Sequence, residues 1–443
     1  MGLLTELERR DPAEVGSELY ALATELYPIC RSITGAGMRK TLSTIGERIP
    51  FETSEVATGT PVFDWTVPKE WNIRDAYIKN REGHRVVDFN TCNLHVLNYS
   101  RPIDSTMHLS ELRPHLFSLP DKPDWIPYRT SYYQENWGFC LSHNQVLALP
   151  DTEYEVYIDS TLEDGHLTYG ECYLRGQSED EVLISCHACH PSLANDNLSG
   201  MVVATLLAQL VAGRDHQYSY RFLFIPGTIG AITWLARNRA TVDRIRHGLV
   251  LTCLGDAGGF HYKKSRRGTA EIDRAVAQAL RDHGEPYQIL EFTPSGYDER
   301  QYCSPGFNLP VGCLMRGVWG TFPEYHTSAD NLEFIRPSSL SGSLRLCAGI
   351  VDVLENNRRY CNQNPYCEPQ LGRRNLYGSL GGDAMPEEIE ARLWVLNLSD
   401  GQHSLLDIAE RSGLRFERVR AAADCLSQTD LICAIPAGAK DQA

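Results

Sequence analysis

The central part of the chain alternates short apolar runs with longer segments that have helical periodicity. Runs rich in β-branched and aromatic residues predict strands at residues 155–160, 165–174, 181–186, 220–226 and 247–256. Periodic apolar positions predict helices at residues 199–213, 231–240 and 270–284. Strands and helices in this alternation predict a mixed, largely parallel sheet with helices on both faces.

Different patterns flank this central part. After a helical opening at residues 14–26, residues from about 60 to 115 mix aromatic and β-branched residues with polar interruptions, which predicts a small antiparallel β unit. Beyond Cys361 a stretch rich in Gly, Pro and Asn predicts a linker. Residues 387–435 then predict three short helices and a final strand, which is the outline of a winged helix-turn-helix.

Composition narrows the class of protein. A chain of 443 residues with 42% hydrophobic residues can bury the core of one large domain with attachments, or of two or three domains. The net charge of −15 argues against a main partner that is nucleic acid or an anionic membrane. The 14 cysteines lie in apolar segments, no signal peptide pattern opens the chain, and no run approaches the roughly 20 apolar residues that span a bilayer. We therefore expect a cytoplasmic protein with free thiols.

One short segment gathers groups that bind metals. Residues 185–200 read SCHACHPSLANDNLSG, with His187 and His190 three residues apart and Asp196 shortly after them. The segment follows a predicted strand and precedes a predicted helix, so we expect it at the carboxyl end of the strand, where open α/β sheets bind ligands. Imidazole and carboxylate are ordinary zinc ligands, and a carboxylate can bridge two ions.

The same segment has alternative interpretations. Cys186 and Cys189 form a C-x-x-C pair, which also occurs as a redox pair or as half of a structural zinc site. Asp196 alone could cap the following helix, and either histidine alone could be structural. A redox pair normally opens a helix directly, whereas HPSLANDN intervenes here. A further histidine downstream favours the metal site.

Polar residues also follow other predicted strands. His326 lies in PEYHTSADN, after an apolar-aromatic turn, and could converge on the first loop. Asp256 ends the predicted strand at 247–256 and precedes glycines, which allow close backbone approach to a ligand, although a turn residue has the same pattern. Asp298 and Glu299 form an acidic pair in the loop SGYDERQY.

The order of these groups resembles the co-catalytic zinc aminopeptidases. More closely, the chain resembles bacterial aminopeptidase-like proteins that carry a small inserted domain and a C-terminal winged helix. The resemblance covers nearly the whole chain and is carried by RSITGAGMR, FDWTVPKEWNI, IPYRTSYY, WGFC, CHACHPSLANDNLSG and PEYHTSADN. It implies a three-layer α/β/α zinc-aminopeptidase-like core with a mixed sheet. We expect a catalytic domain at residues 1–59 with 116–365 and an inserted β domain at residues 60–115. A linker is expected at residues 366–385 and the winged helix at residues 386–443.

The resemblance also implies a metal site. One or two zinc ions would be held by His187 or His190, together with Asp196 and His326. Asp196 would bridge if two ions are present, and Asp256 would match a further carboxylate ligand of the aminopeptidases.

One departure from the aminopeptidases concerns the catalytic base. They carry two adjacent glutamates where this chain has Pro226 and Gly227, so neither the base nor the full ligand set carries over. Among the loop carboxylates we select Glu299 as the base, with Asp298 beside it, although a solvated surface position would explain Glu299 equally well. If Gly227 marks a lost base, Gly227→Glu is expected to raise hydrolysis.

The remaining expectations concern substrate and partners. Arg31, Ser32, Tyr132 and Glu324 are candidates for lining the substrate pocket. The resemblance implies a hydrolase that removes an N-terminal residue from a peptide or cleaves a related aminoacyl amide, in a biosynthetic pathway. The alternative is a catalytically weakened relative that keeps a metal and serves as a binding or scaffold protein.

The predicted winged helix has an acidic balance. Residues 386–443 carry ten acidic and six basic residues, which gives a net charge of −4. A DNA-reading helix is expected to be basic, so we expect no nucleic acid partner and no membrane. We expect the segment to pack on the catalytic domain, on a second subunit or on a protein partner, through Leu393, Val395, Leu405 and Leu426.

Overall fold

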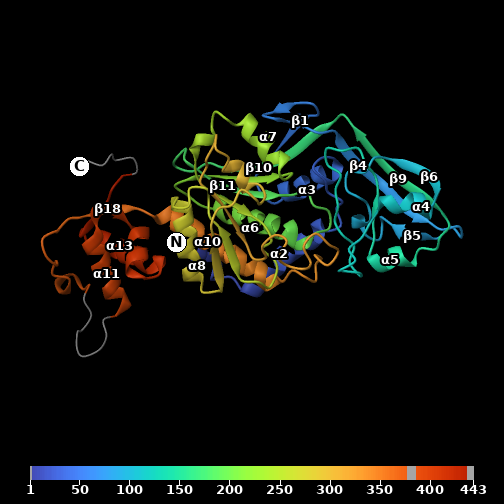
Figure 1. Cartoon of the computed structure of the whole chain (residues 1–443). Coiled ribbons are helices and arrows are strands. Elements are labelled where there is room, and N and C mark those ends of the chain that lie inside the picture. The colour runs from blue at the N-terminus through green and yellow to red at the C-terminus, as the bar shows by residue number, and fades with distance from the viewer. Residues whose placement is uncertain (1, 377–385, 437–443) are drawn as a thin grey trace. The chain divides into compact units, whose positions relative to one another are not determined.

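A computed structural model describes residues 2–376 and 386–436 (Figure 1). Part of the predicted linker, residues 377–385, and the last residues, 437–443, lie outside the described residues. The contacts divide the chain into two compact units. The larger unit comprises residues 7–268 and 287–345, and the smaller unit comprises residues 1–6, 269–286 and 346–443.

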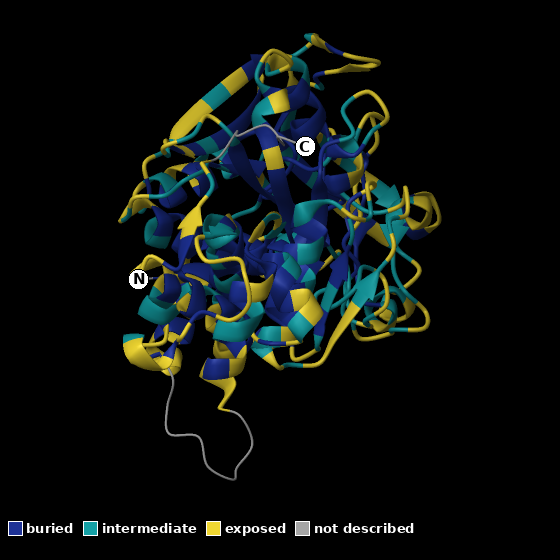
Figure 2. Ribbon diagram, turned by 90° about the vertical axis from the view of Figure 1, so that its left-hand side faces the viewer, coloured by how far each residue is buried: buried dark blue, intermediate teal, exposed yellow. Residues whose placement is uncertain are grey.

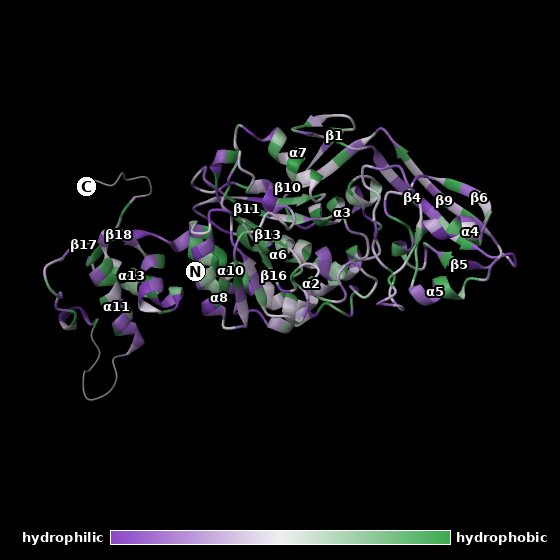
Figure 3. Ribbon diagram, viewed as in Figure 1, coloured by the Kyte–Doolittle hydropathy of each residue, from purple (hydrophilic) through white to green (hydrophobic). Residues whose placement is uncertain are grey.

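An eight-stranded mixed sheet forms the centre of the larger unit. Its order is β1 (Glu52–Ala57), β10 (His166–Leu174), β12 (Ser219–Ile225), β11 (Glu181–His187), β13 (Ile245–Leu251), β16 (Val311–Met315), β14 (Phe260–Lys263) and β15 (Tyr287–Leu290). The four strands β12, β11, β13 and β16 are parallel, while β1, β10 and β14 each pair antiparallel with a neighbour. Every residue of β11 is buried, which is expected for a parallel strand covered on both faces. The hydrophobic colouring of the central strands in Figure 3 agrees with this burial.

Helices accompany this sheet in the larger unit. They are α2 (Pro12–Leu26), α3 (Ala36–Gly46), α6 (Gly200–Ala212), α7 (Ile229–Arg237) and the short α9 (Glu299–Tyr302), while α1 (Leu3–Leu7) and α10 (Pro337–Asn356) have residues in both units. Ten of the thirteen residues of α6 are buried, which explains why its sequence is apolar around nearly the whole helix. Figure 2 shows buried residues in the interior and exposed residues on the outer loops and helix faces. The predicted mixed α/β class is confirmed.

A second, antiparallel sheet lies in the larger unit. Its order is β5 (Arg85–Asp88), β4 (Glu70–Lys79), β9 (Glu153–Glu163) and β6 (Ile103–His108). The strand predicted at 155–160 therefore belongs to this sheet and not to the parallel one, because β9 pairs with β4 along its whole length, from Glu70 with Glu163 to Lys79 with Glu155. Its own core includes Ile78, Tyr154, Val156, Trp137 and Phe139.

Short elements complete the larger unit. They are the hairpin of β2 (Pro61–Val62) and β3 (Trp65–Thr66), the pair β7 (Leu116–Phe117) and β8 (Phe139–Cys140), and the helices α4 (Leu109–Leu112) and α5 (His143–Ala148). In the smaller unit, α8 (Glu271–His283) accompanies the C-terminal elements.

The smaller unit contains the predicted winged helix-turn-helix. Its elements are β17 (Arg359–Asn362), α11 (Glu387–Leu398), β18 (Asp400–Ser404), α12 (Leu405–Ser412), α13 (Phe416–Ser427) and β19 (Ile432–Ala434). The three strands form one sheet in which β17 is central, so this sheet also uses residues that precede the predicted linker. Val395, Leu405 and Leu426 are buried, whereas Leu393 is half-buried. Arg274 of α8 is ion-paired with Asp407 of α12. In the described part of the chain, no helix is long and apolar enough to cross a bilayer.

Candidate functional site

The loop after β11 carries the first metal-binding candidates. His187 is the last residue of β11, which lies between the parallel strands β12 and β13, so its side chain is at the carboxyl end of the sheet. The chain then passes His190 and a helical turn, Ala194–Ser199, before α6 begins at Gly200. This is the ligand-binding edge of an open α/β sheet, as predicted from the sequence.

Three histidines converge on one carboxylate at this edge. His187 Nε2 is 2.8 Å from Asp196 Oδ1, and His326 Nε2 is 3.0 Å from Asp196 Oδ2. His190 Nδ1 lies 3.5 Å from Asp196 Oδ1 and 3.2 Å from the Asp196 carbonyl oxygen. We call His187, His190, Asp196 and His326 the histidine cluster. The sequence predicted all four residues, and the structure brings them together.

The surroundings shift the pKa values of Asp196 and His326 towards the forms in which a carboxylate and an imidazole bind metals. Burial acts to raise the pKa of Asp196, but the charge of His190 and hydrogen bonds to the three imidazoles hold it well below its usual value. Burial lowers the pKa of His326, and the nearby carboxylate only partly opposes this effect. An ionised carboxylate and neutral imidazoles are the forms that coordinate zinc.

The residues present fit a metal ion. His187, His190 and Asp196 each offer one ligand atom within 4.8 Å of the others, and all three are buried. His187 Nδ1 is buried without a hydrogen-bond partner among the described residues, so no hydrogen bond to the protein competes with metal binding by this nitrogen. A buried carboxylate with three imidazoles is a nitrogen and oxygen donor set typical of zinc.

Two further acids hold the loop that carries Asp196. Asp330 accepts hydrogen bonds from the backbone N–H groups of Asn195, at 2.6 Å, and Asp196, at 3.0 Å. Asp256 accepts from the Asn195 side chain at 2.9 Å and from the backbone of Gly258 and Gly317. Both oxygens of Asp256 therefore accept hydrogen bonds from the protein next to the cluster, and its role as a metal ligand stays a prediction.

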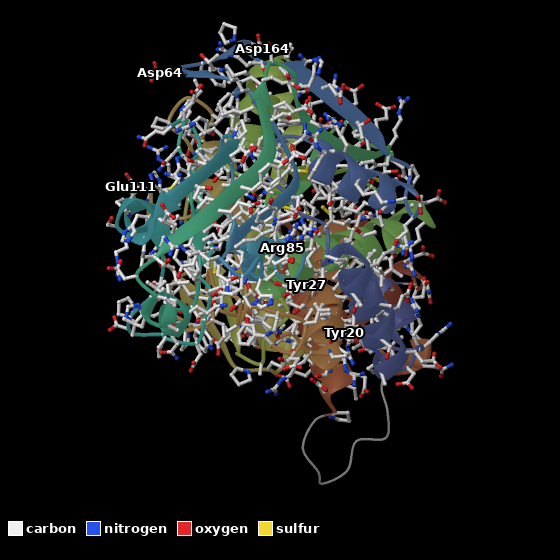
Figure 4. The ribbon with its side chains drawn as sticks, turned by 90° about the vertical axis from the view of Figure 1, so that its right-hand side faces the viewer. Tyr20, Tyr27, Asp64, Arg85, Glu111 and Asp164 are labelled. Atoms are coloured by element: carbon white, nitrogen blue, oxygen red, sulfur yellow. The ribbon has the colours of Figure 1, made fainter. Side chains whose placement is uncertain are left out.

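The predicted substrate-binding residues Arg31 and Ser32 are both buried, and Arg31 contacts the loop that carries His190. Arg31 is fully buried, and its guanidinium donates to the carbonyl oxygens of His190, at 2.9 Å, and Leu26, at 2.6 Å. Ser32 donates to Asn98 Oδ1. Tyr20 lies along α2 and Tyr27 caps its end (Figure 4), and the Tyr27 carbonyl accepts from Ser192 in the same loop. Hydrogen bonds from Arg31 and to the end of α2 thus hold the loop that carries His190.

Aromatic side chains border the cluster on another side. The Tyr128 ring packs edge-on against His190, at 5.0 Å between centroids, and against His326, at 5.2 Å. Its hydroxyl is 2.8 Å from that of Tyr132, a predicted substrate-binding residue. Glu324, two residues before His326, is half-buried, and within the described ranges its carboxylate has no hydrogen-bond partner.

Tyr297 fills the space next to Gly227. Its ring lies 4.1 Å from that of His187, and its hydroxyl is 3.4 Å from both His190 Nε2 and the Gly227 carbonyl oxygen. A Cβ atom at Gly227 would lie 2.0 Å from the Tyr297 ring. A glutamate side chain at position 227 would therefore need the space that the Tyr297 ring already fills.

The predicted catalytic acids lie behind Tyr297. Glu299 is fully buried, its carboxylate is 2.7 Å from Lys263 Nζ, and it accepts a hydrogen bond from the Tyr297 backbone N–H at 3.1 Å. Burial and the charge of Glu299 raise the pKa of Asp298 well above its usual value. Both acids thus lie in the interior, and Glu299 holds the backbone that carries Tyr297.

Sequence reasoning missed Asp330, Tyr128 and Tyr297 at the site, and Lys263 beside Glu299. Asp330 stood within the quoted motif PEYHTSADN and could have been recognised there. Nothing in the pattern around Tyr297 indicated that it contacts His187 and His190, and nothing around Lys263 indicated that it pairs with Glu299, because these contacts join segments that are far apart in the sequence.

Most of the chain matches a known protein family. The family described as a domain of unknown function, DUF4910, matches residues 20–357. The chain belongs to this family. A winged helix-turn-helix family matches residues 358–434, which agrees with the C-terminal elements of the smaller unit.

Two relatives of this DUF4910 protein are named for an aminopeptidase-like domain or as a peptidase. A Clostridium acetobutylicum protein named as a polysaccharide biosynthesis protein with an aminopeptidase-like domain is 52% identical over 424 residues, covering 96% of this chain and 98% of that protein. A crystal structure from the same organism, assigned by name as a peptidase, has a TM-score of 0.93 at 50% identity and covers 98% of this chain and all of the other.

More distant structures share the fold. A zinc aminopeptidase from Bacillus subtilis has a TM-score of 0.55 at 14% identity, covering 77% of this chain and 95% of that one. A peptidase M28 precursor from Shewanella amazonensis has a TM-score of 0.57 at 13% identity, covering 80% and 97%. The predicted aminopeptidase-like core is confirmed at the level of the fold.

Proposed function

We propose that this DUF4910 protein is a zinc-dependent hydrolase that releases an N-terminal amino acid from a peptide or a related amide. The observation that carries the proposal is the Asp196 carboxylate, which meets the imidazoles of His187, His190 and His326 at the ligand-binding edge of the sheet. The zinc aminopeptidase fold of distant neighbours supports the same class of reaction.

The proposed division of roles follows the contacts. Asp196, His187 and His326 would hold the ion, and His190 would complete the set. A bound zinc ion would supply polarisation of the scissile carbonyl and a more acidic water molecule. Glu324, whose carboxylate is uncommitted, receives the free amino group of the substrate. Asp256, Asp330 and Arg31 do not act on the substrate but hold the two loops in place.

Tyr297 takes the place that we first gave to a carboxylate base. Its hydroxyl lies beside His190 Nε2, and burial raises its pKa well above the usual value, so it stays a hydrogen-bond donor. It is placed to donate to the carbonyl oxygen of an amide bound at the cluster, where the transition state gains negative charge. Glu299 acts through Tyr297 as a positioning residue, because Lys263 engages its carboxylate.

The test combines metal content with amide hydrolysis. Purified protein should contain about one or two zinc ions per chain, and His326→Ala and Asp196→Asn should each lose most of that metal. His84→Ala is the matched control, since His84 is exposed and remote from the cluster. Amino-acid release from a panel of aminoacyl amides should cease on chelation and return with zinc. Full zinc content in both cluster variants would refute the site.

The alternative of a weakened binding protein has one observation in its favour. The segment that carries the acidic pair in aminopeptidases has no carboxylate here, only Pro226 and Gly227. Zinc bound through the cluster without hydrolysis of any amide in the panel would favour that alternative over the hydrolase.

A further inference from the structure

A pocket of about 430 Å³ opens beside the β2–β3 hairpin. This volume is within the roughly 300–1,000 Å³ of small-molecule sites. The hairpin, α7 with the residues after it, and α9 with the loop after it supply its walls, through Phe63, Asp64, Trp65, Arg239, Gln301 and Phe307. None of these residues belongs to the histidine cluster.

Aromatic rings line the pocket and remain open to solvent. Phe63 is 51% exposed and Trp65 is 45% exposed, although rings of this size are usually mostly buried. Phe63 packs edge-on against Phe307 at 5.8 Å between centroids, and Trp65 against Tyr133 at 5.3 Å. These contacts fix the orientation of the rings while leaving their surfaces available, which is the arrangement of a binding wall rather than of a core.

The hairpin turn presents Phe63 in an unfavourable backbone conformation. Phe63 has φ of 57°, a left-handed region that glycine, asparagine and aspartate adopt more readily than a bulky aromatic residue. A small turn residue would make a more stable hairpin. Strain of this kind persists only where the surrounding structure holds it, and it is most frequent at functional sites. Here the conformation places the Phe63 ring in the wall of the pocket.

Polar groups of the pocket are uncommitted. Within residues 2–376 and 386–436, the side chains of Asp64, Arg239 and Gln301 make no hydrogen bond or ion pair. Asp64 lies at the outer edge of the hairpin in Figure 4. Together they offer a carboxylate acceptor, a guanidinium donor and an amide that is both.

The combination restricts the chemistry of a ligand. A carboxylate and a guanidinium at one pocket cancel in charge, so neither an anion nor a cation is favoured overall. Asp64 and Arg239 are exposed and Gln301 is half-buried, so a purely apolar ligand would displace water from polar side chains without replacing its hydrogen bonds. A neutral molecule with several hydroxyl groups and one face of C–H groups satisfies both the polar side chains and the rings.

We propose that this pocket binds a neutral sugar ring, which stacks on Trp65 or Phe63 and shares its hydroxyls with Asp64, Arg239 and Gln301. Side-chain contacts connect the pocket to the histidine cluster. The Trp65, Tyr133 and Tyr132 rings pack in sequence, the Tyr132 hydroxyl is hydrogen-bonded to that of Tyr128, and the Tyr128 ring contacts His190 and His326. We infer from this series of contacts that the sugar is part of the molecule that carries the amide, a second step that rests on the proposed hydrolase function.

Direct binding tests the pocket without any hydrolysis. Glucose, galactose, mannose and N-acetylglucosamine are titrated into the full chain and followed by saturation-transfer NMR. At least one should bind with a dissociation constant on the order of 1 mM. Trp65→Ala should weaken binding at least about fivefold, and Asp64→Asn and Arg239→Met should weaken it as well. Tyr287→Ala, which removes a ring that is 44% exposed outside the pocket, should leave it unchanged.

Two results would overturn the sugar assignment. One is a dissociation constant above about 10 mM for every sugar; the other is tighter binding of inorganic phosphate or phenylalanine amide than of any sugar. His187→Ala should bind the sugar like the parent chain, which separates this result from failure of the metal site.

Hydrolysis then tests the link to the cluster. The substrates are alanine joined through an amide to the 2-amino group of glucosamine, and alanine cyclohexylamide, whose ring lacks hydroxyls. Water cleaves the C–N bond, giving alanine and the free amine in both cases. The sugar amide should have a kcat/KM about tenfold higher, mainly through KM, and Trp65→Ala should abolish the difference. Equal rates in the parent chain would overturn the link, whereas no hydrolysis of either amide would refute the hydrolase function and leave the binding result standing.

Discussion

Removal of the Lys263 charge should destabilise the larger unit strongly. The Lys263 and Glu299 side chains are 3% and 0% exposed, and their charged atoms are 2.7 Å apart. Lys263 also donates to the Ser295 carbonyl oxygen, and Glu299 accepts from the Tyr297 backbone. Lys263→Met keeps the length and apolar stem of the side chain but leaves the Glu299 carboxylate buried without its counter-ion.

The magnitude follows from burial. At an effective dielectric constant of 20, two charges at this separation attract by about 6 kcal/mol, and desolvation of both groups offsets most of that gain. Removal of one partner loses the attraction but keeps the desolvation of the other, so Lys263→Met should cost about 3–5 kcal/mol. Lys263→Met combined with Glu299→Gln removes both charges and keeps an acceptor for Tyr297, so the double variant should be at least about 2 kcal/mol more stable than Lys263→Met.

Urea unfolding followed by tryptophan fluorescence measures these differences. With a slope near 3 kcal/mol per molar, a loss of 3 kcal/mol moves the midpoint by about 1 M. Lys69→Met is the matched control, because Lys69 is paired with Glu135 at the surface, where both side chains are about half exposed or more. That control should change stability by less than about 1 kcal/mol. A Lys263→Met midpoint equal to that of the control, or a double variant no more stable than the single one, would refute the reasoning.

Three further predictions concern other parts of the molecule. Burial acts to raise the pKa of Glu70, but hydrogen bonds from Arg39, the His166 amide and Asn72 lower it to about 2. It therefore contributes stability above pH 4.5 that is lost as the pH falls towards 2, and Glu70→Gln should flatten unfolding free energy against pH across that window. Gly227→Glu should lower hydrolysis, and it should lower the free energy of unfolding by about 1–3 kcal/mol because it displaces Tyr297. The double variant with Tyr297→Ala should recover that stability. Higher activity in Gly227→Glu alone would contradict this prediction. The full chain should show no binding to duplex DNA near 50 mM salt in an anisotropy titration. The reason is that residues 386–443 are net acidic and that Arg418 lies near Glu387 and Glu388. Salt-sensitive binding in the micromolar range would contradict this prediction.

The sequence alone predicted the histidine cluster because its members obey a local rule. His187, His190 and Asp196 lie in one loop between a strand and a helix, and the carboxyl ends of parallel strands meet at one edge of a sheet. His326 follows from the same rule once its motif is recognised. The mixed α/β class and the winged helix were also predictable, since strand and helix periodicities are properties of short segments.

The partners of the catalytic candidates could not be predicted in the same way. Glu299 and Asp256 are acids on loops near strand ends, and the sequence gives no sign that Lys263 or the Gly258 and Gly317 amides engage them. The membership of β9 in the small sheet was likewise decided by its long pairing with β4. Such contacts depend on which distant segments the fold brings together.

The Gly227 position shows most directly what the sequence determines and what the tertiary structure decides. The sequence by itself determined that no carboxylate stands at positions 226 and 227, and that the candidate metal ligands lie before and after these positions along the chain. Only the tertiary structure decided that a phenol fills the space, because Tyr297 is 70 residues away along the chain. A glycine leaves room without specifying its occupant, and close packing then requires that some distant side chain fill the space.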